Sequence, residues 1–419
     1  MPHTPTSPEL IEAPRLRFIP FRRDDLLMRL CSLDEWPSSD HANHGDEFDA
    51  GTARITRVFA AEFHELRQEI KSLYSPYDPD ADTRSIGTLE NIGDTSALTE
   101  RLTELLNRAN YERLTERDLK RAFRSASLFK IRLKVDMKAF SEVLLFARGV
   151  NRREETISYV GGLIKRRVTF LNYDRVLLYL CFADVEAIGE PNQAPGRVMI
   201  KLFQNVPEAD LEMLFPNTEV AMRLSDRLLI GVPALASGAV IAFTKLGTPL
   251  LLLGTLLGFW LGLSAQPVTL DKQGLVIISA GLGAVAGYIW KQFSNYRNRK
   301  AKFRQALTQN LYFKLLDNNA GVLLRILDDA EDSECKEAWV ALRFLMQHPD
   351  GIEEAALDQE IEAWFVDQLG AEIDFEIDDA LNKLARLGLA ARSEDRWYYV
   401  PSNLSDEFTV EPVATGPSS

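Results

Sequence analysis

The spacing of apolar residues divides the chain into three regions. Between residues 52 and 74 and again between residues 96 and 110, apolar positions recur every three or four residues, which predicts two helices. After Ser127, short runs rich in Val, Ile, Leu, Phe and Tyr are separated by Asn, Asp, Gly and Pro. No long helical pattern separates these runs. We therefore expect an antiparallel sheet with the earlier helices on one face, in an α+β domain over residues 15–227.

The longest apolar region begins at Leu228 and ends at Trp290. It consists of three uncharged runs of 17, 25 and 18 residues, and a helix needs ~20 apolar residues to cross hydrocarbon. The pattern predicts a membrane insert over residues 228–292, with a transmembrane helical hairpin formed by spans near 246–263 and 274–290. The first run, 228–244, is interrupted by glycine and proline, which predicts an interfacial helix or part of a first span. Three true spans are the alternative.

Basic residues flank the predicted insert on both sides. The C-terminal flank has no acidic residue and contains six bases: Lys291, Arg297, Arg299, Lys300, Lys302 and Arg304. Positive charge marks cytoplasmic flanks, so an even number of crossings and an integral location in a bacterial inner membrane are expected, or in an organelle membrane if the chain is eukaryotic. Both water-exposed domains would then be cytoplasmic.

Glycines recur at four-residue spacing within the predicted spans. They are Gly254, Gly258, Gly262, Gly283 and Gly287. Small residues on one helix face let two backbones approach closely, so this pattern favours helix packing within the hairpin or between copies.

Charge and composition limit the remaining regions. The chain has 419 residues and a net charge of −13, and from Asp317 onward it has 24 acidic and seven basic residues. Such an acidic region repels nucleic acid. Three scattered cysteines indicate neither a disulfide framework nor a zinc site, and no cofactor is expected. A disordered tail is expected at 1–14, a loose tail at 404–419, and a basic, helical connector at 293–330.

The C-terminal residues 331–403 have the order of a winged helix. Three helical patterns, near 336–347, 357–369 and 377–387, are followed by two short strands around a turn at 393–395. The third helix begins with acidic residues, whereas a DNA-reading helix is basic. We interpret this domain as protein-binding.

Two clusters of charged residues are candidate sites. Arg152, Arg153, Lys165, Arg166 and Arg167 lie on the predicted strands, where they either protect strand edges or contact anionic headgroups. Glu208, Asp210 and Glu212 form a compact acidic group, but no His or nucleophile accompanies them, so no catalytic residue is assigned.

Two stretches resemble a known family. They are IKLFQNVPEADLEMLFPNTEVAMRL and LTQNLYFKLLDNNAGVLLRILDDAEDSECKEAWVAL, and the resemblance extends over most of residues 15–400. They are similar to a family of membrane proteins of unknown function typified by transmembrane protein 143. The resemblance implies a membrane location and a hairpin insert, with homologues in bacteria and organelles. It implies no activity.

The leading hypothesis is a non-catalytic, membrane-anchored scaffold. Its two cytoplasmic domains would recruit a protein partner, mainly through the C-terminal domain, and the chain could form a homo-oligomer. The alternative is a protein that binds or modifies lipids at the membrane surface.

Overall fold

The structure is a computed structural model that describes residues 15–33, 41–83, 94–115, 117–119, 132–159, 164–183, 196–216, 219–221, 254–255, 257, 259–261 and 272–401. These residues form two compact units. The first contains the described residues of 1–122, 137–208 and 314–419, and the second those of 123–136 and 209–313. The two ends of the chain therefore fold together in one unit, which a division into successive domains does not anticipate.

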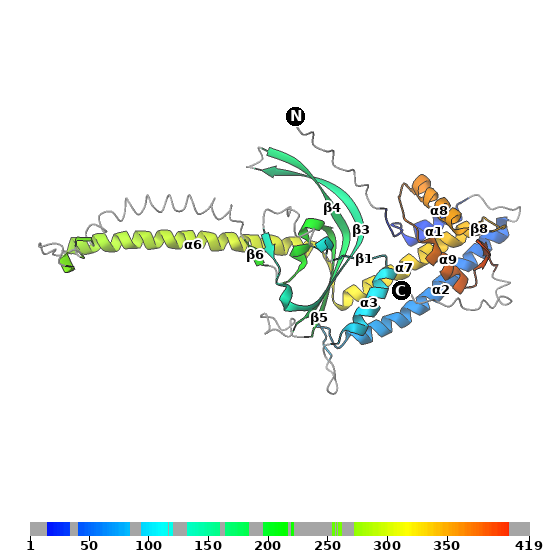
Figure 1. Cartoon of the computed structure of the whole chain (residues 1–419), viewed down its shortest axis with the longest axis horizontal. Helices are drawn as coiled ribbons and strands as arrows, with labels where there is room; N and C mark the ends of the chain where they lie inside the picture. The colour runs from blue at the N-terminus through cyan, green and yellow to red at the C-terminus, as the bar shows by residue number, and fades with distance from the viewer. Residues whose placement is uncertain are drawn as a thin grey trace, which may run out of the picture. The chain divides into compact units, whose positions relative to one another are not determined.

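The first unit contains a five-stranded antiparallel sheet (Figure 1). In spatial order its strands are β1 (Glu112–Arg113), β3 (Phe140–Tyr159), β4 (Ile164–Phe182), β5 (Val198–Pro207) and β7 (Leu315–Asn318). The short 3-10 helix η1 (Met137–Ala139) precedes β3. This arrangement confirms the expected α+β class with an antiparallel sheet.

Strands β3 and β4 are longer than the sequence pattern predicts, because each joins two separate runs. The polar residues between the runs lie opposite each other in the ladder, where Asn151 Nδ2 donates to Asp174 Oδ1 over 2.6 Å. Gly149 has a φ of 71°, and a Cβ there would lie 2.4 Å from Asp174 Oδ2. Glycine is therefore required at this bend, and the expected turn is an irregularity within a continuous strand.

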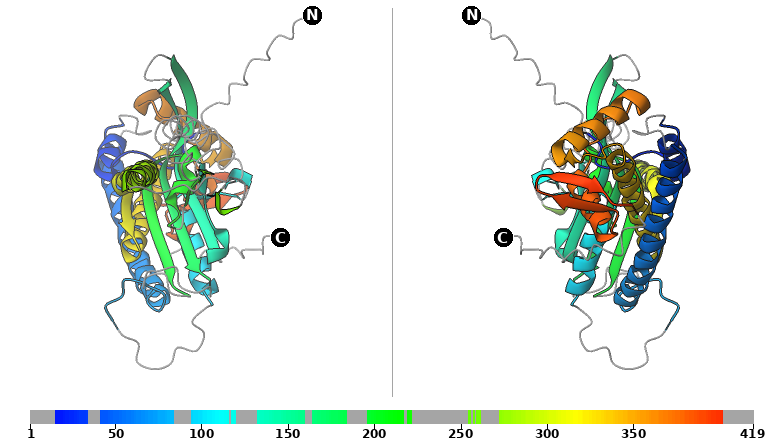
Figure 2. Two further views of the ribbon diagram at one scale, coloured as in Figure 1. Left: turned by 90° about the vertical axis from the view of Figure 1, so that its left-hand side faces the viewer. Right: turned by 90° about the vertical axis from the view of Figure 1, so that its right-hand side faces the viewer.

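Helix α7 (Ala320–Leu345) contacts this sheet at β5 and β7. Helices α1 (Arg23–Cys31), α2 (His41–Tyr74) and α3 (Ser96–Arg108) belong to the same helical layer, which Figure 2 shows from both ends. Helix α7 packs against α1, α2 and α3. Core side chains of the sheet, such as Phe146, Leu177 and Ile200, share one apolar cluster with these helices.

The C-terminal elements continue from α7 in the same unit. They are β8 (Ile352–Glu353), α8 (Glu354–Leu369), α9 (Ile377–Arg386), β9 (Ala390–Ser393) and β10 (Arg396–Tyr399). The strands form a small sheet in the order β8-β10-β9. This succession is that of a winged helix. Ile361, Trp364 and Phe365 on α8 are buried, as their helical spacing predicts.

The second unit contains β2 (Arg132–Lys134) paired with β6 (Glu219–Ala221), most of the 3-10 helix η4 (Glu208–Leu214), and the long helix α6 (Lys272–Lys314). The residues predicted as the second span, 274–290, are the first part of α6. The same helix includes all six bases of the predicted flank and ends at Lys314.

The structure contradicts the expected membrane insert. Among the described residues, no helix is both long enough and apolar enough to cross a membrane. The apolar part of α6 between Gln273 and Lys291 has 17 residues, which rise only ~26 Å against a hydrocarbon core of ~30 Å. The transmembrane hairpin and the integral membrane location, from which the placement of both domains was derived, were therefore wrong expectations. Most of the predicted segments 228–244 and 246–263 lies outside the described residues.

Candidate interaction surface

A buried cluster of charges fixes α9 against α7. The Lys383 side chain is 9% exposed, and its Nζ lies 2.8 Å from Glu334 Oε2 and 3.0 Å from Glu337 Oε2. Asp379, one turn earlier on α9, adds a third carboxylate at 2.6 Å. Burial alone lowers the pKa of Lys383, but the three carboxylates outweigh it and raise the pKa above its ordinary value.

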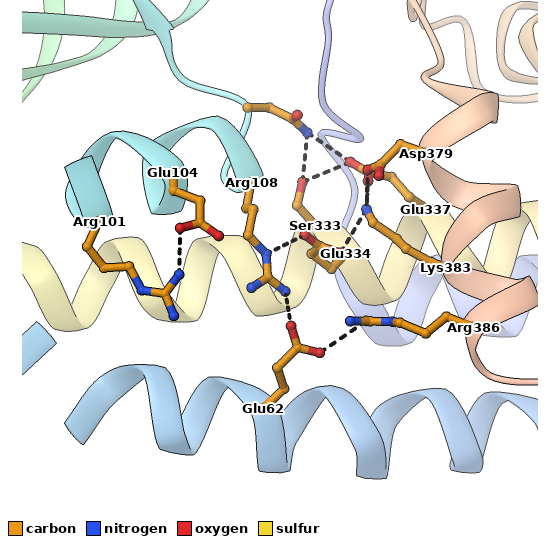
Figure 3. A network of polar contacts seen from close by, with 11 residues as sticks. Glu62, Arg101, Glu104, Arg108, Ser333, Glu334, Glu337, Asp379, Lys383 and Arg386 are labelled. Atoms are coloured by element: carbon orange, nitrogen blue, oxygen red, sulfur yellow. Dashed lines mark hydrogen bonds and ion pairs between the residues drawn. The ribbon is translucent and has the colours of Figure 1, made fainter. Parts of the chain in front are cut away.

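The same network extends to α2 and α3 (Figure 3). Arg108 on α3 donates to Glu334 over 2.7 Å and to Glu62 on α2 over 2.9 Å. Arg386 on α9 donates to the other oxygen of Glu62 over 3.0 Å. Four helices are therefore joined by ion pairs, and Lys383 and Arg386 of α9 both bind carboxylates of this chain.

A groove of about 610 Å³ lies on the outer side of α8. One wall of the groove consists of α8 residues at helical spacing, and the other consists of residues 372–373 and Arg15. The lining residues are Gln359, Glu362, Ala363, Val366, Asp367, Glu372, Ile373 and Arg15. Val366 is 47% exposed, and Asp367 and Glu372 are also exposed. We call this surface the α8 groove. It offers an apolar contact next to negative charge.

The N-terminal segment fixes one side of the α8 groove. Leu16 N–H donates to Glu372 O over 3.0 Å, and Asp374 N–H donates to Leu16 O over 2.8 Å. Arg15 pairs with Glu362 at 2.7 Å, and Phe21 stacks on Phe365 with ring centroids 6.3 Å apart. These contacts hold the groove in shape before any ligand binds, which lowers the entropic cost of binding.

An acidic group behind the α8 groove adds to its negative potential. Burial, together with the charges of Glu362 and Asp374, raises the pKa of Asp358 to about 6, while Arg15 opposes them. Asp358 is half-buried, and its Oδ1 has no hydrogen-bond donor among the described residues. The local field therefore disfavours one more negative charge and favours a cation.

The predicted basic cluster lies on β3 and β4. Arg152, Arg153 and Arg167 are exposed, and Arg153 donates to Asn205 Oδ1 over 2.9 Å. In the ladder, Lys165 pairs with Ser158 and Arg166 with Ile157. These five residues therefore lie on two paired strands, and their contact with lipid headgroups stays a prediction.

The predicted acidic group lies on η4. Asp210 is buried, whereas Glu208 and Glu212 are half-buried, and burial raises the pKa of Glu212. No group of three or more His, Cys, Asp or Glu suited to a metal ion occurs in the part of the chain that the structure describes.

The glycines and bases of the predicted insert can be placed in part. A Cβ at Gly254, Gly283 or Gly287 would meet nothing within 4 Å, and Gly258 and Gly262 lie outside the described residues. Close helix packing at these positions stays a prediction. On α6, Lys291, Arg297 and Lys302 are exposed.

The α8 groove was not identified from the sequence. The available signal was Val366, an apolar residue outside the helical spacing of 357, 361, 364 and 365, with Asp367 beside it. The second wall comes from residues 372–373 and the N-terminal segment, and no local pattern reveals their proximity.

Comparison with known proteins adds a family match for part of the chain. Residues 173–321 match the family described as Protein of unknown function (DUF3754). The DUF3754 match begins in β4 and ends at the start of α7. It confirms the expected resemblance to an uncharacterised family over this stretch, and it assigns no activity. No solved structure matches this chain.

Proposed function

We propose that this chain is a non-catalytic adaptor that binds another protein through the α8 groove. The observation that carries the proposal is the groove itself, which combines the exposed Val366 with Asp367 and Glu372 in a fixed frame. Its chemistry suits a partner segment that presents basic and apolar residues together. Apolar anchors supply most of the affinity in such contacts, and charge complementarity selects the partner.

The ion pairs made by the basic residues of α9 favour a protein partner over DNA. In helix-turn-helix proteins a basic recognition helix enters the major groove. Here Lys383 is buried among three carboxylates, and Arg386 is paired with Glu62. These two charges are therefore occupied within the chain, and the adjacent surface is acidic.

The lipid-binding alternative is less well supported. It rests on the exposed Arg152, Arg153 and Arg167. Glu154 and Glu155 follow the arginines directly on β3, and carboxylates there repel anionic headgroups. The resemblance to proteins typified by transmembrane protein 143, beyond the matched residues 173–321, is also a proposal, and it suggests no activity.

Peptide binding to the full chain tests the adaptor proposal. The probe is a labelled amphipathic peptide rich in Lys and Leu, and its counterpart with Glu in place of Lys is the control. We expect the Lys peptide to bind the wild-type chain and to bind the double variant Val366→Glu, Asp367→Lys at least about tenfold more weakly, a loss of ~1.4 kcal/mol. Asp395→Lys, which removes an exposed acid from the β9–β10 turn, should bind like wild type. Equal binding to the groove variant contradicts the proposal.

A further inference from the structure

The β3–β4 hairpin extends beyond the strands that flank it. Strands β3 and β4 pair from Phe140 with Phe182 to Tyr159 with Ile164. Strand β5 covers β4 only between Asn172 and Cys181, and β1 covers β3 only at Phe146 and Ala147. Within the described residues, the outer edge of β3 from 150 to 159 therefore has no strand partner, nor has that of β4 from 164 to 171.

An open strand edge is a template for another strand, because every second residue directs its N–H and C=O outward. Residues 150–159 contain no proline that would remove a donor. Proteins commonly protect such edges with charge. The effect of that charge depends on its pattern along each strand.

The charge pattern on β3 is self-complementary in one orientation. Residues 150–157 are VNRREETI, in which Arg152 and Arg153 are followed directly by Glu154 and Glu155. If two copies of this segment run antiparallel about a two-fold axis, an arginine of each copy lies opposite a glutamate of the other. Parallel pairing in register would place like charges together. The pattern therefore permits one orientation of self-association and opposes the other.

The geometry of the ladder restricts the register. A two-fold axis pairs one strand edge with itself, so an outward-facing residue meets another outward-facing residue, and their numbers differ by an even number. One register centres on Arg153 and places Arg152 opposite Glu154 twice. The other centres on Glu154 and places Arg153 opposite Glu155 twice. Each register forms two Arg–Glu pairs and one pair of like charges at the two-fold axis. Each residue of that like-charge pair also has an opposite charge diagonally across the two strands.

The open edge of β4 lacks this property. Residues 164–171 are IKRRVTFL, with three bases and no acid. Parallel self-pairing, or antiparallel self-pairing centred on the bases, would place positive charges against each other, which is destabilising. Antiparallel pairing centred on Val168 places each base opposite an uncharged residue and forms no ion pair. Self-pairing of β4 therefore gains no ion pair in any register, whereas self-pairing of β3 gains two.

We propose that two copies of this chain form a two-fold dimer by antiparallel pairing of their β3 edges over residues 150–157. The five-stranded sheet of each copy then continues into the other across this junction. Strand β1 pairs with β3 at residues 146–147, outside the segment proposed to pair, and residues 152–154 of that segment are exposed. The α8 groove is not part of this interface, so adaptor binding and dimerisation are separate properties.

Charge-reversal variants of the full chain test this pairing by light scattering after size-exclusion chromatography. Wild type is expected to be a dimer. Arg152→Glu with Arg153→Glu gives four acids, Glu154→Arg with Glu155→Arg gives four bases, and each variant alone should dimerise at least about tenfold more weakly. An equimolar mixture of the two should restore a dimer. The four-residue variant that exchanges both pairs should dimerise like wild type, although it also lacks the Arg153–Asn205 hydrogen bond.

A disulfide trap identifies the register. In a Cys31→Ser background, which removes the exposed cysteine, Arg153→Cys and Glu154→Cys each place a thiol at the centre of one register. One of them should form a covalent dimer on oxidation, and a cysteine at Glu112 on β1 should not. Circular dichroism confirms that each variant is folded.

A monomeric wild-type chain at high micromolar concentration, or a dimer that survives both charge reversals, overturns the proposal. A groove variant that loses peptide binding but stays dimeric separates it from the adaptor proposal.

Discussion

The buried charge of Lys383 is balanced only because its carboxylates come from two helices. Glu334 and Glu337 are each almost fully buried. Removing Lys383 leaves Glu337 without its cation and Glu334 with Arg108 alone, in a medium that solvates charge poorly, which costs more than the ion pair itself contributes. We expect Lys383→Met to lower the free energy of unfolding of the full chain by about 3–5 kcal/mol in urea titrations.

Arg386→Gln is the matched control for Lys383→Met. Arg386 is on the same helix and in the same network, but its side chain is 53% exposed. Exposed pairs are screened by water, so this variant should lose less than about 1 kcal/mol. Similar losses for the two variants would show that the network is not a buried one.

Asp358 gives the chain a predictable pH response. Its folded-state pKa is about 6 against an ordinary value of 3.8, so the folded chain holds this proton more tightly than the unfolded chain. The contribution of Asp358 to stability therefore falls as pH rises from about 4 through 6 and stays low above that. We expect Asp358→Asn to raise the melting temperature at pH 7 but not at pH 4. Because the carboxyl is half-buried, the gain should be below about 1 kcal/mol. A melting-temperature difference that is the same at both pH values would contradict this assignment.

Single residues also show where local patterns fail. Asn318 and Asn319 before a glycine predict a turn, and Asn319 does have a φ of 49°. Its backbone N–H, however, donates to Ile200 O over 2.6 Å, and its Oδ1 accepts from Ile200 N over 3.1 Å. Asn319 thus binds the backbone of β5, a contact with a residue far away in the sequence. By contrast, Thr115 and Asp118 have the spacing of a capping box, which is a local pattern, and both of its reciprocal bonds form.

At the scale of elements, α7 is the helix that packs against α1, α2, α3, α8 and α9 in the first unit. The sequence predicts two helices here, with the second opening the C-terminal domain, but the structure has one helix from Ala320 to Leu345. Its Arg343 is fully buried and donates to the carbonyl oxygens of Leu30 and Leu33 over 3.1 and 2.8 Å. The predicted domain boundary at residue 331 would therefore cut through a continuous helix.

This continuity has a testable consequence. A fragment of residues 331–403 alone lacks α1, α2 and the first turns of α7, so the buried face of α7 and the Arg343 side chain would be exposed. We expect the fragment to show weak amide dispersion in its NMR spectrum and no cooperative thermal transition. A fragment with a sharp transition near that of the full chain would show that the C-terminal elements fold independently.

Helix α6 contradicts the second predicted span because its uncharged part, 274–290, is short for a hydrocarbon core. Periodicity and apolar content correctly indicated a helix over 274–290. They did not indicate that the same helix would continue through the basic residues to Lys314. A hydropathy window shows how apolar a run is, and it does not show where the helix containing that run ends.

The whole molecule shows which information was local and which was not. The order of the C-terminal elements, the early helices and the antiparallel class follow from periodicity, which acts over a few residues. The folding of both chain ends into one unit does not follow from periodicity, because it involves contacts between residues far apart in the sequence. Arg108 and Glu334 are 226 residues apart, and Arg17 and Glu376 are 359 residues apart. The α8 groove belongs to the second kind, since Arg15 and Glu372 line it together.

The most direct test of the adaptor account is partner capture by the tagged full chain from its native cell extract, quantified by mass spectrometry. Three forms are compared: wild type, the groove variant Val366→Glu with Asp367→Lys, and the control Asp395→Lys. The account predicts at least one protein that wild type and the control capture equally and that the groove variant loses. Identical sets of captured proteins for all three forms would contradict it.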